Sequence, residues 1–152
     1  MRILKTAVLA LCAVLLVSSA GLAADTVKIG LLVPLTGPAA ADGTSALYSV
    51  QIALDQVNAA GGVLGKKVEL VYYDDRADAK EAVALAHKLI EQDKIAAFVA
   101  GSYSLPTRAV APIFQEESIP LVAAYAIHPD VTRAGDFCFR NGFLGMVEGK
   151  AA

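Results

Sequence analysis

Short apolar segments rich in β-branched residues punctuate the chain after its first 24 residues. They span Val27–Val33, Lys67–Tyr73, Ile95–Ala100 and Pro120–Ala124, and a weaker one spans Phe137–Phe139. Glycine, proline or aspartate bounds each segment, as is typical of β-strands. The pattern therefore predicts four strands and a weaker fifth.

Helical spacing fills the intervals between these segments. Apolar residues from Ala46 to Val57 recur on one face of a helix, and Gly61-Gly62 is suited to end it. We expect Asp42 or Thr44 to cap the start of this helix, because a side-chain oxygen there can accept a free backbone N–H.

Two further helices are predicted in the same way. An apolar stripe over residues 82–90 follows Asp78, a candidate N-cap, and a second stripe over residues 110–114 follows Ser104, another candidate N-cap. Pro112 lies inside the last helix and is expected to bend or shorten it.

Strands that alternate with helices predict a parallel sheet joined by right-handed crossovers. The expected fold class is α/β, with an open, doubly wound parallel sheet. Ligands bind such sheets beyond the carboxyl ends of the strands. The loops of interest are therefore residues 34–44, 74–78, 101–106 and 125–129.

The first 24 residues have the pattern of a secretory signal peptide. Arg2 and Lys5 precede an uncharged run over residues 6–17, and small residues continue to Ala24. This run is shorter than the roughly 20 residues that span a bilayer. We expect cleavage after Ala24, or after one of the alanines just before it, and export of the protein; an uncleaved membrane anchor is the alternative.

The two cysteines receive different interpretations. Leu11 is bulky where a lipid-modified cysteine follows a small residue, so we expect Cys12 to be removed with the signal rather than acylated. Cys138 is then the one cysteine left and has no partner for an intrachain disulfide. Its neighbours Phe137 and Phe139 favour a buried thiol.

Charge and spacing argue against several classes of function. Loss of Arg2 and Lys5 lowers the 13 basic residues to 11 against 15 acidic ones, and this mildly acidic balance without a basic run favours no nucleic-acid partner. His87 and His128 stand alone, so no metal site is expected. No phosphate-loop or dinucleotide fingerprint is present in a strand–turn–helix context, and no cofactor is expected.

The strongest local signal for binding is the turn at Gly101, where the third strand leads into a helix that begins near Ser104. Backbone N–H groups and the positive end of the helix dipole converge at such a point, and they can bind a carboxylate or phosphate. Ser102, Ser104 and Thr107 add hydroxyl groups. The alternative is plain N-capping by Ser104.

Two other groups suggest chemistry less strongly. Asp74-Asp75 follows the second strand, as the acids of some magnesium sites do, but Arg76 and Lys80 offer local charge pairing instead. His128 could act as a base, although a histidine that caps the turn at Pro129 is the alternative that we favour.

Several motifs together make the chain resemble the first lobe of periplasmic solute-binding proteins of the leucine/isoleucine/valine type, which serve ABC transporters. The motifs are Pro34-Leu35-Thr36-Gly37-Pro38, Asn58-Ala59-Ala60-Gly61-Gly62, Tyr73-Asp74-Asp75, Gly101-Ser102 and Phe139-Arg140. The resemblance covers nearly all of residues 26–150. It implies a protein of two α/β lobes that close around a solute.

The resemblance also implies how the chain is organised. Residues 25–144 would form the first lobe, and residues 145–152 would begin a helix that leads to a second lobe outside this sequence. The implied protein is periplasmic, is not an enzyme, and delivers an amino acid or small organic acid to a membrane permease. We expect residues 25–152 alone to bind solute weakly.

The resemblance carries site residues onto this sequence. Ser104 would hold the solute carboxylate, and further contacts would come from Ser102, Tyr103, Tyr125, Ala126, Ile127 and Asp42. Two positions depart from the family pattern, because Ile127 lacks a hydroxyl group and Asp42 stands where an aromatic residue is common. Both departures leave open which solute is bound.

Two other hypotheses remain at this point. A sensory ligand-binding domain shares the architecture and would be followed by a membrane-spanning helix. A secreted α/β enzyme would use Asp74, Asp75 or His128 for chemistry.

Overall fold

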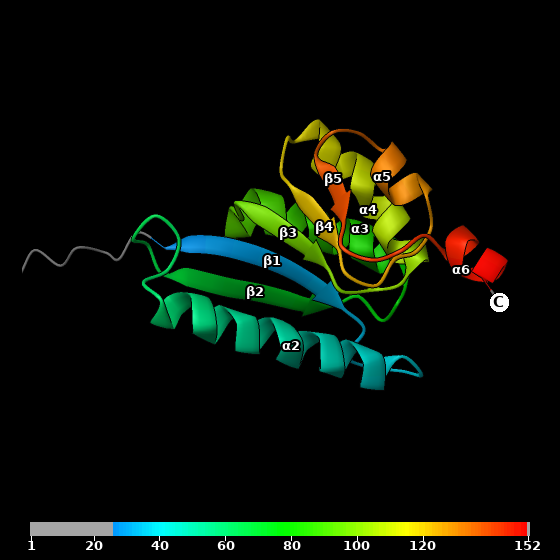
Figure 1. Cartoon of the computed structure of the whole chain (residues 1–152). Helices are drawn as coiled ribbons and strands as arrows, with labels where there is room; N and C mark the ends of the chain where they lie inside the picture. Colours follow the sequence, from blue (N-terminus) through cyan, green and yellow to red (C-terminus); the bar gives the residue numbers. More distant parts are fainter. Residues whose placement is uncertain (1–25, 152) are drawn as a thin grey trace, which may run out of the picture.

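Five parallel strands form one sheet in the computed structural model, which describes residues 26–151 (Figure 1). The strands are β1 (Val27–Val33), β2 (Val68–Asp74), β3 (Ala97–Ala100), β4 (Leu121–Ala123) and β5 (Cys138–Arg140). Their order is β2-β1-β3-β4-β5, and every neighbouring pair is parallel. All five predicted strands are confirmed, including the weak fifth.

Helices cover both faces of the sheet, as a doubly wound fold requires. Helix α2 (Ala40–Ala59) packs on β1 and β2, and helices α3 (Ala79–Lys88) and α4 (Ser104–Glu116) pack on the opposite face (Figure 1). Short helices α5 (Asp130–Arg133) and α6 (Gly145–Ala151) lie near the end of the described chain. None of the helices within residues 26–151 has the length and apolar character needed to cross a membrane.

Two of the predicted helix ends are confirmed. The Asp78 carboxylate accepts the backbone N–H groups of Lys80 and Glu81 at 2.8 and 2.9 Å, and so caps α3. After α2, Gly61 and Gly62 adopt positive φ angles of 103° and 77°, which an ordinary side chain disfavours.

Other local predictions are wrong. Neither Asp42 nor Thr44 caps α2, because the turn at Gly37, whose carbonyl accepts the Ala40 N–H, starts the helix earlier. Pro112 does not shorten α4, which continues to Glu116, and the alternative that it bends the helix stays a prediction. Burial of Val110 and Phe114 against the sheet keeps the helix intact on both sides of the proline.

The π-helix η1 (Leu89–Asp93) was not predicted and extends α3. It ends at Lys94, which has a left-handed backbone (φ 58°). The apolar stripe over residues 82–90 fits an α-helical and a π-helical turn equally well, so the residue pattern could not predict the change from one to the other.

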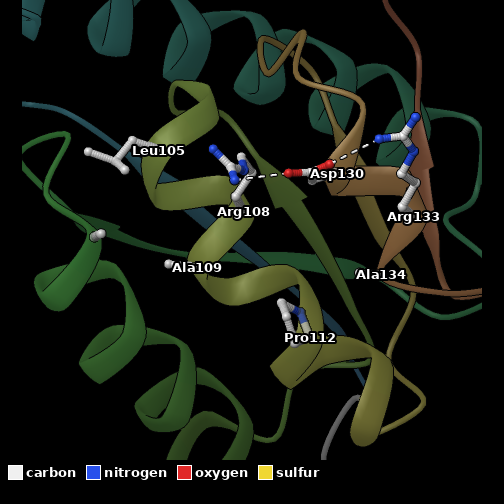
Figure 2. Close-up of a pocket in the computed structure, with 8 residues that line it drawn as sticks. Leu105, Arg108, Ala109, Pro112, Asp130, Arg133 and Ala134 are labelled. Carbon is white, nitrogen blue, oxygen red and sulfur yellow. Dashed lines mark hydrogen bonds and ion pairs between the residues drawn. The ribbon is translucent and has the colours of Figure 1, made fainter.

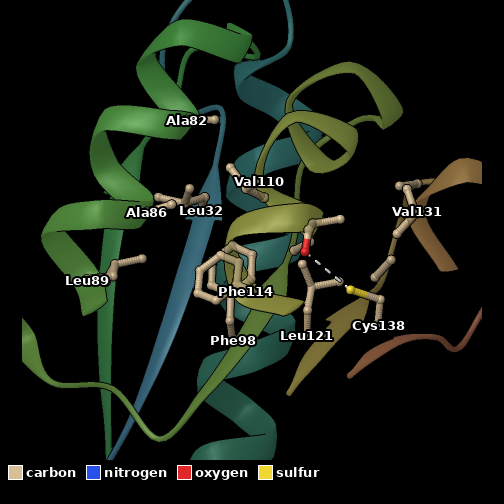
Figure 3. Packing of buried hydrophobic residues seen from close by; sticks show 14 of the residues in the cluster. Leu32, Ala82, Ala86, Leu89, Phe98, Val110, Phe114, Leu121, Val131 and Cys138 are labelled. Carbon is tan, nitrogen blue, oxygen red and sulfur yellow. Dashed lines mark hydrogen bonds between the residues drawn. The ribbon is translucent and has the colours of Figure 1, made fainter. Parts of the chain in front are cut away.

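The larger core lies between the sheet and the α3/α4 layer (Figure 3). The rings of Phe98 and Phe114 stack there with centroids 4.1 Å apart. Cys138 is buried beside them, and its thiol contacts the Ala111 carbonyl at 3.4 Å. The prediction of a buried Cys138 is confirmed, and burial raises the pKa of this thiol.

The opposite face of the sheet is covered unevenly. Leu31 and Val33 of β1 pack under α2, but α2 does not extend over β4 and β5. Val99, Val122 and Phe139 are paired in register across β3, β4 and β5 on this face. Val122 is 38% exposed and Phe139 is 51% exposed, so an apolar stripe meets solvent here.

Candidate functional site

The candidate site lies at the carboxyl edge of the sheet, where the strand order reverses between β1 and β3. The chain leaves β1 toward α2 on one face and leaves β3 toward α4 on the other, and sheets of this kind bind ligands at such a switch point. Tyr103 in the β3–α4 turn donates its O–H to the carboxylate of Asp42 in α2. This bond brings two of the predicted site residues together between the loop after β3 and helix α2.

Ser104 is the first residue of α4, and its hydroxyl group does not cap the helix. The N-cap is Tyr103, which makes no side-chain capping bond. The Ser104 Oγ instead accepts the backbone N–H groups of Ile127 and His128, at 3.2 and 3.3 Å. The N-cap prediction is therefore wrong, because the loop after β4 supplies donors that local sequence does not reveal.

The two accepted bonds decide what the Ser104 hydroxyl group can still do. A hydroxyl has two acceptor positions and one donor hydrogen. With both acceptor positions occupied, the hydrogen is left to donate to a further acceptor, and accepted bonds strengthen such a donor.

Backbone donors surround this hydroxyl group. The N–H groups of Ser104 and Leu105 are in the first turn of α4, where no intrahelical acceptor exists, and none is found for them elsewhere in residues 26–151. The dipole of this 13-residue helix adds partial positive charge at the same point. Together these groups can hold a carboxylate without a basic side chain.

The segment after β4 reaches the same place. Tyr125 and Ile127 are exposed, whereas Ala126 is buried, so only the first and last of these predicted residues present side chains at the surface. Arg140 of β5 holds the segment by donating to the carbonyls of Ala126 (3.0 Å) and His128 (2.6 Å).

Sequence reasoning missed the role of Arg140. The arginine was noted only as part of a family motif, and the signal available was its place at the end of a strand beside the ligand edge. The segment is also tied at Ile127, whose carbonyl accepts the N–H of Gly145 at 3.2 Å.

Ser102 occupies a different environment from the other predicted residues. Its side chain is only 3% exposed, and its Oγ has no hydrogen-bond partner in the described structure. The residue lines a buried gap together with Asp75. A direct contact between this hydroxyl and a solute stays a prediction.

Asp74 has a structural role. Its carboxylate accepts the Leu35 N–H at 2.8 Å, the Thr36 hydroxyl at 2.6 Å and the Arg76 N–H at 2.9 Å, and so fixes the loop after β1. Burial would raise the pKa of Asp74, but these hydrogen bonds together lower it. Asp74 is thus structural, but its partners are backbone groups and Thr36; the expected charge pairing with Arg76 and Lys80 is not found within residues 26–151.

His128 has the turn role that we favoured. Its Nδ1 accepts the Asp130 N–H at 3.2 Å.

Asp130 also pairs with Arg108 (2.9 Å) and Arg133 (3.3 Å) at a surface pocket of about 500 Å³ beside α4 and α5 (Figure 2). Within residues 26–151, no cluster of three histidine, cysteine or acidic side chains could hold a metal ion.

A family model described as periplasmic binding protein matches residues 26–148. The chain belongs to the periplasmic binding protein family. This assignment agrees with the fold, with the site at the sheet edge, and with the resemblance noted from the sequence motifs.

Relatives of this chain are named for the binding of amino acids. A leucine-, isoleucine-, valine-, threonine- and alanine-binding protein of Pseudomonas aeruginosa is 36% identical over 136 residues, which are 89% of this chain and 36% of that protein. A Leu/Ile/Val-binding protein of Escherichia coli is 33% identical over 135 residues, 89% of this chain and 36% of that protein. The chain thus spans about a third of the length of these relatives, which are binding proteins and not enzymes.

Solved structures extend the comparison to a second solute class. The branched-chain amino acid transporter substrate-binding protein LivJ from Streptococcus pneumoniae, in complex with isoleucine, matches with a TM-score of 0.75 and 32% identity, over 79% of this chain and 34% of that one. A solute-binding protein of an ABC transporter from Rhodopseudomonas palustris, in complex with 3,4-dihydroxybenzoic acid, matches with a TM-score of 0.73 and 28% identity, over 79% and 32%. Both solutes carry a carboxylate.

Proposed function

We propose that this chain is the first lobe of an extracytoplasmic solute-binding component of an ABC transporter, which captures a small carboxylate solute for a membrane permease. The observation that carries the proposal is the free donor set at the start of α4: the Ser104 hydroxyl hydrogen and the backbone N–H groups of Ser104 and Leu105. Charge-assisted bonds of this kind are stronger than neutral ones.

Export belongs to the same proposal. Residues 1–24 have the pattern of a cleavable signal peptide. They lie outside the described residues, so the periplasmic location of the mature chain remains a prediction that agrees with the family.

The solute that we propose is an amino acid of the branched-chain or a related type. Asp42 places a carboxylate beside the start of α4, where the Tyr103 hydroxyl donates to it. The pKa of Tyr103 is raised, and the largest cause of the rise is the hydrogen bond that Tyr103 donates to Asp42. The phenol therefore stays protonated, and so a donor, at neutral pH. The negative charge of Asp42 attracts the ammonium group of a zwitterionic amino acid, whereas it repels a hydroxybenzoate, whose only charge is negative.

Calorimetry on the protein encoded by the complete gene tests the proposal. Isoleucine, leucine, alanine, 4-hydroxybenzoate and 3,4-dihydroxybenzoate are titrated into the wild type and Asp42→Asn. We expect an amino acid to bind most tightly to the wild type, and Asp42→Asn to improve hydroxybenzoate binding relative to that amino acid. Binding of no carboxylate solute would refute the function, and tightest binding of a hydroxybenzoate would refute the solute class.

A further inference from the structure

Asp75 is a fully buried carboxyl group at the ligand edge of the sheet. It follows β2, is 0% exposed, and is held by backbone bonds from its N–H to the Val33 carbonyl and from the Asp78 N–H to its carbonyl. Its Oδ1 accepts the Ala77 N–H at 3.0 Å. Its Oδ2 is buried and has no partner in the described structure.

Ser102 lies across a narrow gap from this carboxyl group. The gap is otherwise lined by apolar side chains of β1, β3, α3 and α4 and by Thr107, and it has no room for a water molecule. The Thr107 hydroxyl donates its hydrogen to the Ser102 carbonyl and therefore cannot also donate it to Asp75. Among the side chains that line the gap, the Ser102 hydroxyl is the donor left for Asp75 Oδ2, and both oxygens are buried without another partner in the described structure.

We propose that Asp75 is a positioning residue of the solute site, whose carboxylate accepts the Ser102 hydroxyl hydrogen and so holds the turn that presents Ser104. The reason is the cost of leaving buried polar atoms unpaired, which is the more severe when one of them is charged. The two residues line the same gap, and that gap has no room for a water molecule that could bridge them.

This bond would span three strands. Asp75 follows β2, its N–H is bonded to the end of β1, and Ser102 follows β3. The link would fix the Gly101–Ser104 turn against the body of the sheet from below, while Ser104 is held from the other side by Ile127 and His128. The inference rests on the proposed function only in that this turn is taken as the solute site.

The charges around Asp75 are few. Its pKa is raised, chiefly by burial; the Ala77 N–H and the Ser102 hydroxyl group act in the lowering direction, and the charge of Asp74 raises it further. The other groups that line the gap carry no charge. A change in the Ser102 hydroxyl should therefore be visible directly in the titration of Asp75.

The test uses the chain itself and needs no solute. The pKa of the Asp75 carboxyl is measured by NMR in the wild type and in Ser102→Ala, with Ser104→Ala as the matched control on the same turn. Loss of a donor to the ionised carboxylate should raise the pKa of Asp75 by about 1 in Ser102→Ala. Ser104→Ala should leave it unchanged, because that hydroxyl group bonds to Ile127 and His128.

A second readout reports on positioning. The amide protons of Ile127 and His128 are bonded to Ser104 Oγ, so their hydrogen exchange should become severalfold faster in Ser102→Ala as the turn loosens. An unchanged pKa of Asp75 in Ser102→Ala would overturn the bond, and unchanged exchange at Ile127 and His128 would overturn its positioning role. Neither result depends on whether the proposed solute class is right.

Discussion

Two adjacent acids, Asp74 and Asp75, show how environment alone separates the behaviour of identical side chains. Asp74 accepts three hydrogen bonds from Leu35, Thr36 and Arg76 and has a lowered pKa. Asp75 is buried in an apolar gap and has a raised pKa. The two residues should therefore respond to pH with opposite signs.

For Asp74, the folded-state pKa lies below the unfolded value. Its contribution to the free energy of unfolding is fully present above about pH 4 and is lost as the pH falls through the lowered pKa. We expect Asp74→Asn to be about 1 kcal/mol less stable than the wild type at pH 7 and to approach it in acid. Urea denaturation over a pH series measures the difference, and a gap that widens in acid would contradict the assignment.

For Asp75, the folded-state pKa lies above the unfolded value, so the sign reverses. The stability of the wild type relative to Asp75→Asn should be greatest below about pH 4 and should be lost as the pH rises through the raised pKa. The same denaturation series tests this expectation. If the wild type instead gains stability over Asp75→Asn between pH 4 and pH 7, the pKa of Asp75 is not raised in the folded state.

Single residues were predicted from sequence unequally well. Ser104 is predicted as the central site residue, because a hydroxyl at the start of a helix is recognisable locally, but its hydrogen-bond partners Ile127 and His128 are 23 and 24 residues away. The same limit hid Arg140, which supports the site through carbonyls 14 and 12 residues before it. Local patterns mark the polar groups, whereas the topology decides their hydrogen-bond partners: backbone N–H donors for Ser104 and backbone carbonyl acceptors for Arg140.

At the scale of elements, the start of α2 depends on a close approach between the helix and the loop before it. A Cβ atom built at Gly43 would lie 1.9 Å from the Pro34 carbonyl oxygen. The helix can therefore begin at Ala40 and place Asp42 beside Tyr103 only if residue 43 lacks a side chain.

Gly43→Ala should consequently destabilise the fold by about 1–3 kcal/mol, despite the better helix propensity of alanine. Gly149→Ala in α6 is the matched control, because no atom lies within 4 Å of its added Cβ. Thermal denaturation should show a lower midpoint for Gly43→Ala alone. Equal midpoints for the two variants would mean that the helix shifts freely away from Pro34.

Elements were largely predictable, since strand segments are apolar and bounded by turn residues. Failures came where tertiary contacts override local preference: α4 continues past Pro112 because its apolar stripe is buried, and α2 begins before its polar candidates for a cap. Helix α5 has only four residues, too few to show a period.

At the scale of the molecule, the exposed end of the apolar stripe, at Val122 and Phe139, is the clearest feature without a cover in the described structure, whereas Val99 packs against the core under α2. The matched part of this chain covers only 36% of the length of each of these relatives. Exposed apolar patches on a soluble chain favour association.

Phe139→Ser should therefore lower the self-association of residues 25–152. Leu64→Ser is the control, since Leu64 is 94% exposed on a loop away from the stripe. Sedimentation velocity at increasing concentration measures the effect. If Leu64→Ser lowers association as much as Phe139→Ser, the stripe is not the surface responsible.

The central claim is that the start of α4 binds the carboxylate of an amino acid through Ser104. The most direct test is calorimetry with isoleucine and isoleucinamide on the wild type and Ser104→Ala, using the protein from the complete gene. Ser104→Ala should weaken isoleucine binding by about 1–3 kcal/mol and should affect isoleucinamide less, because the amide lacks the charge. An isoleucine dissociation constant unchanged by Ser104→Ala would contradict the claim.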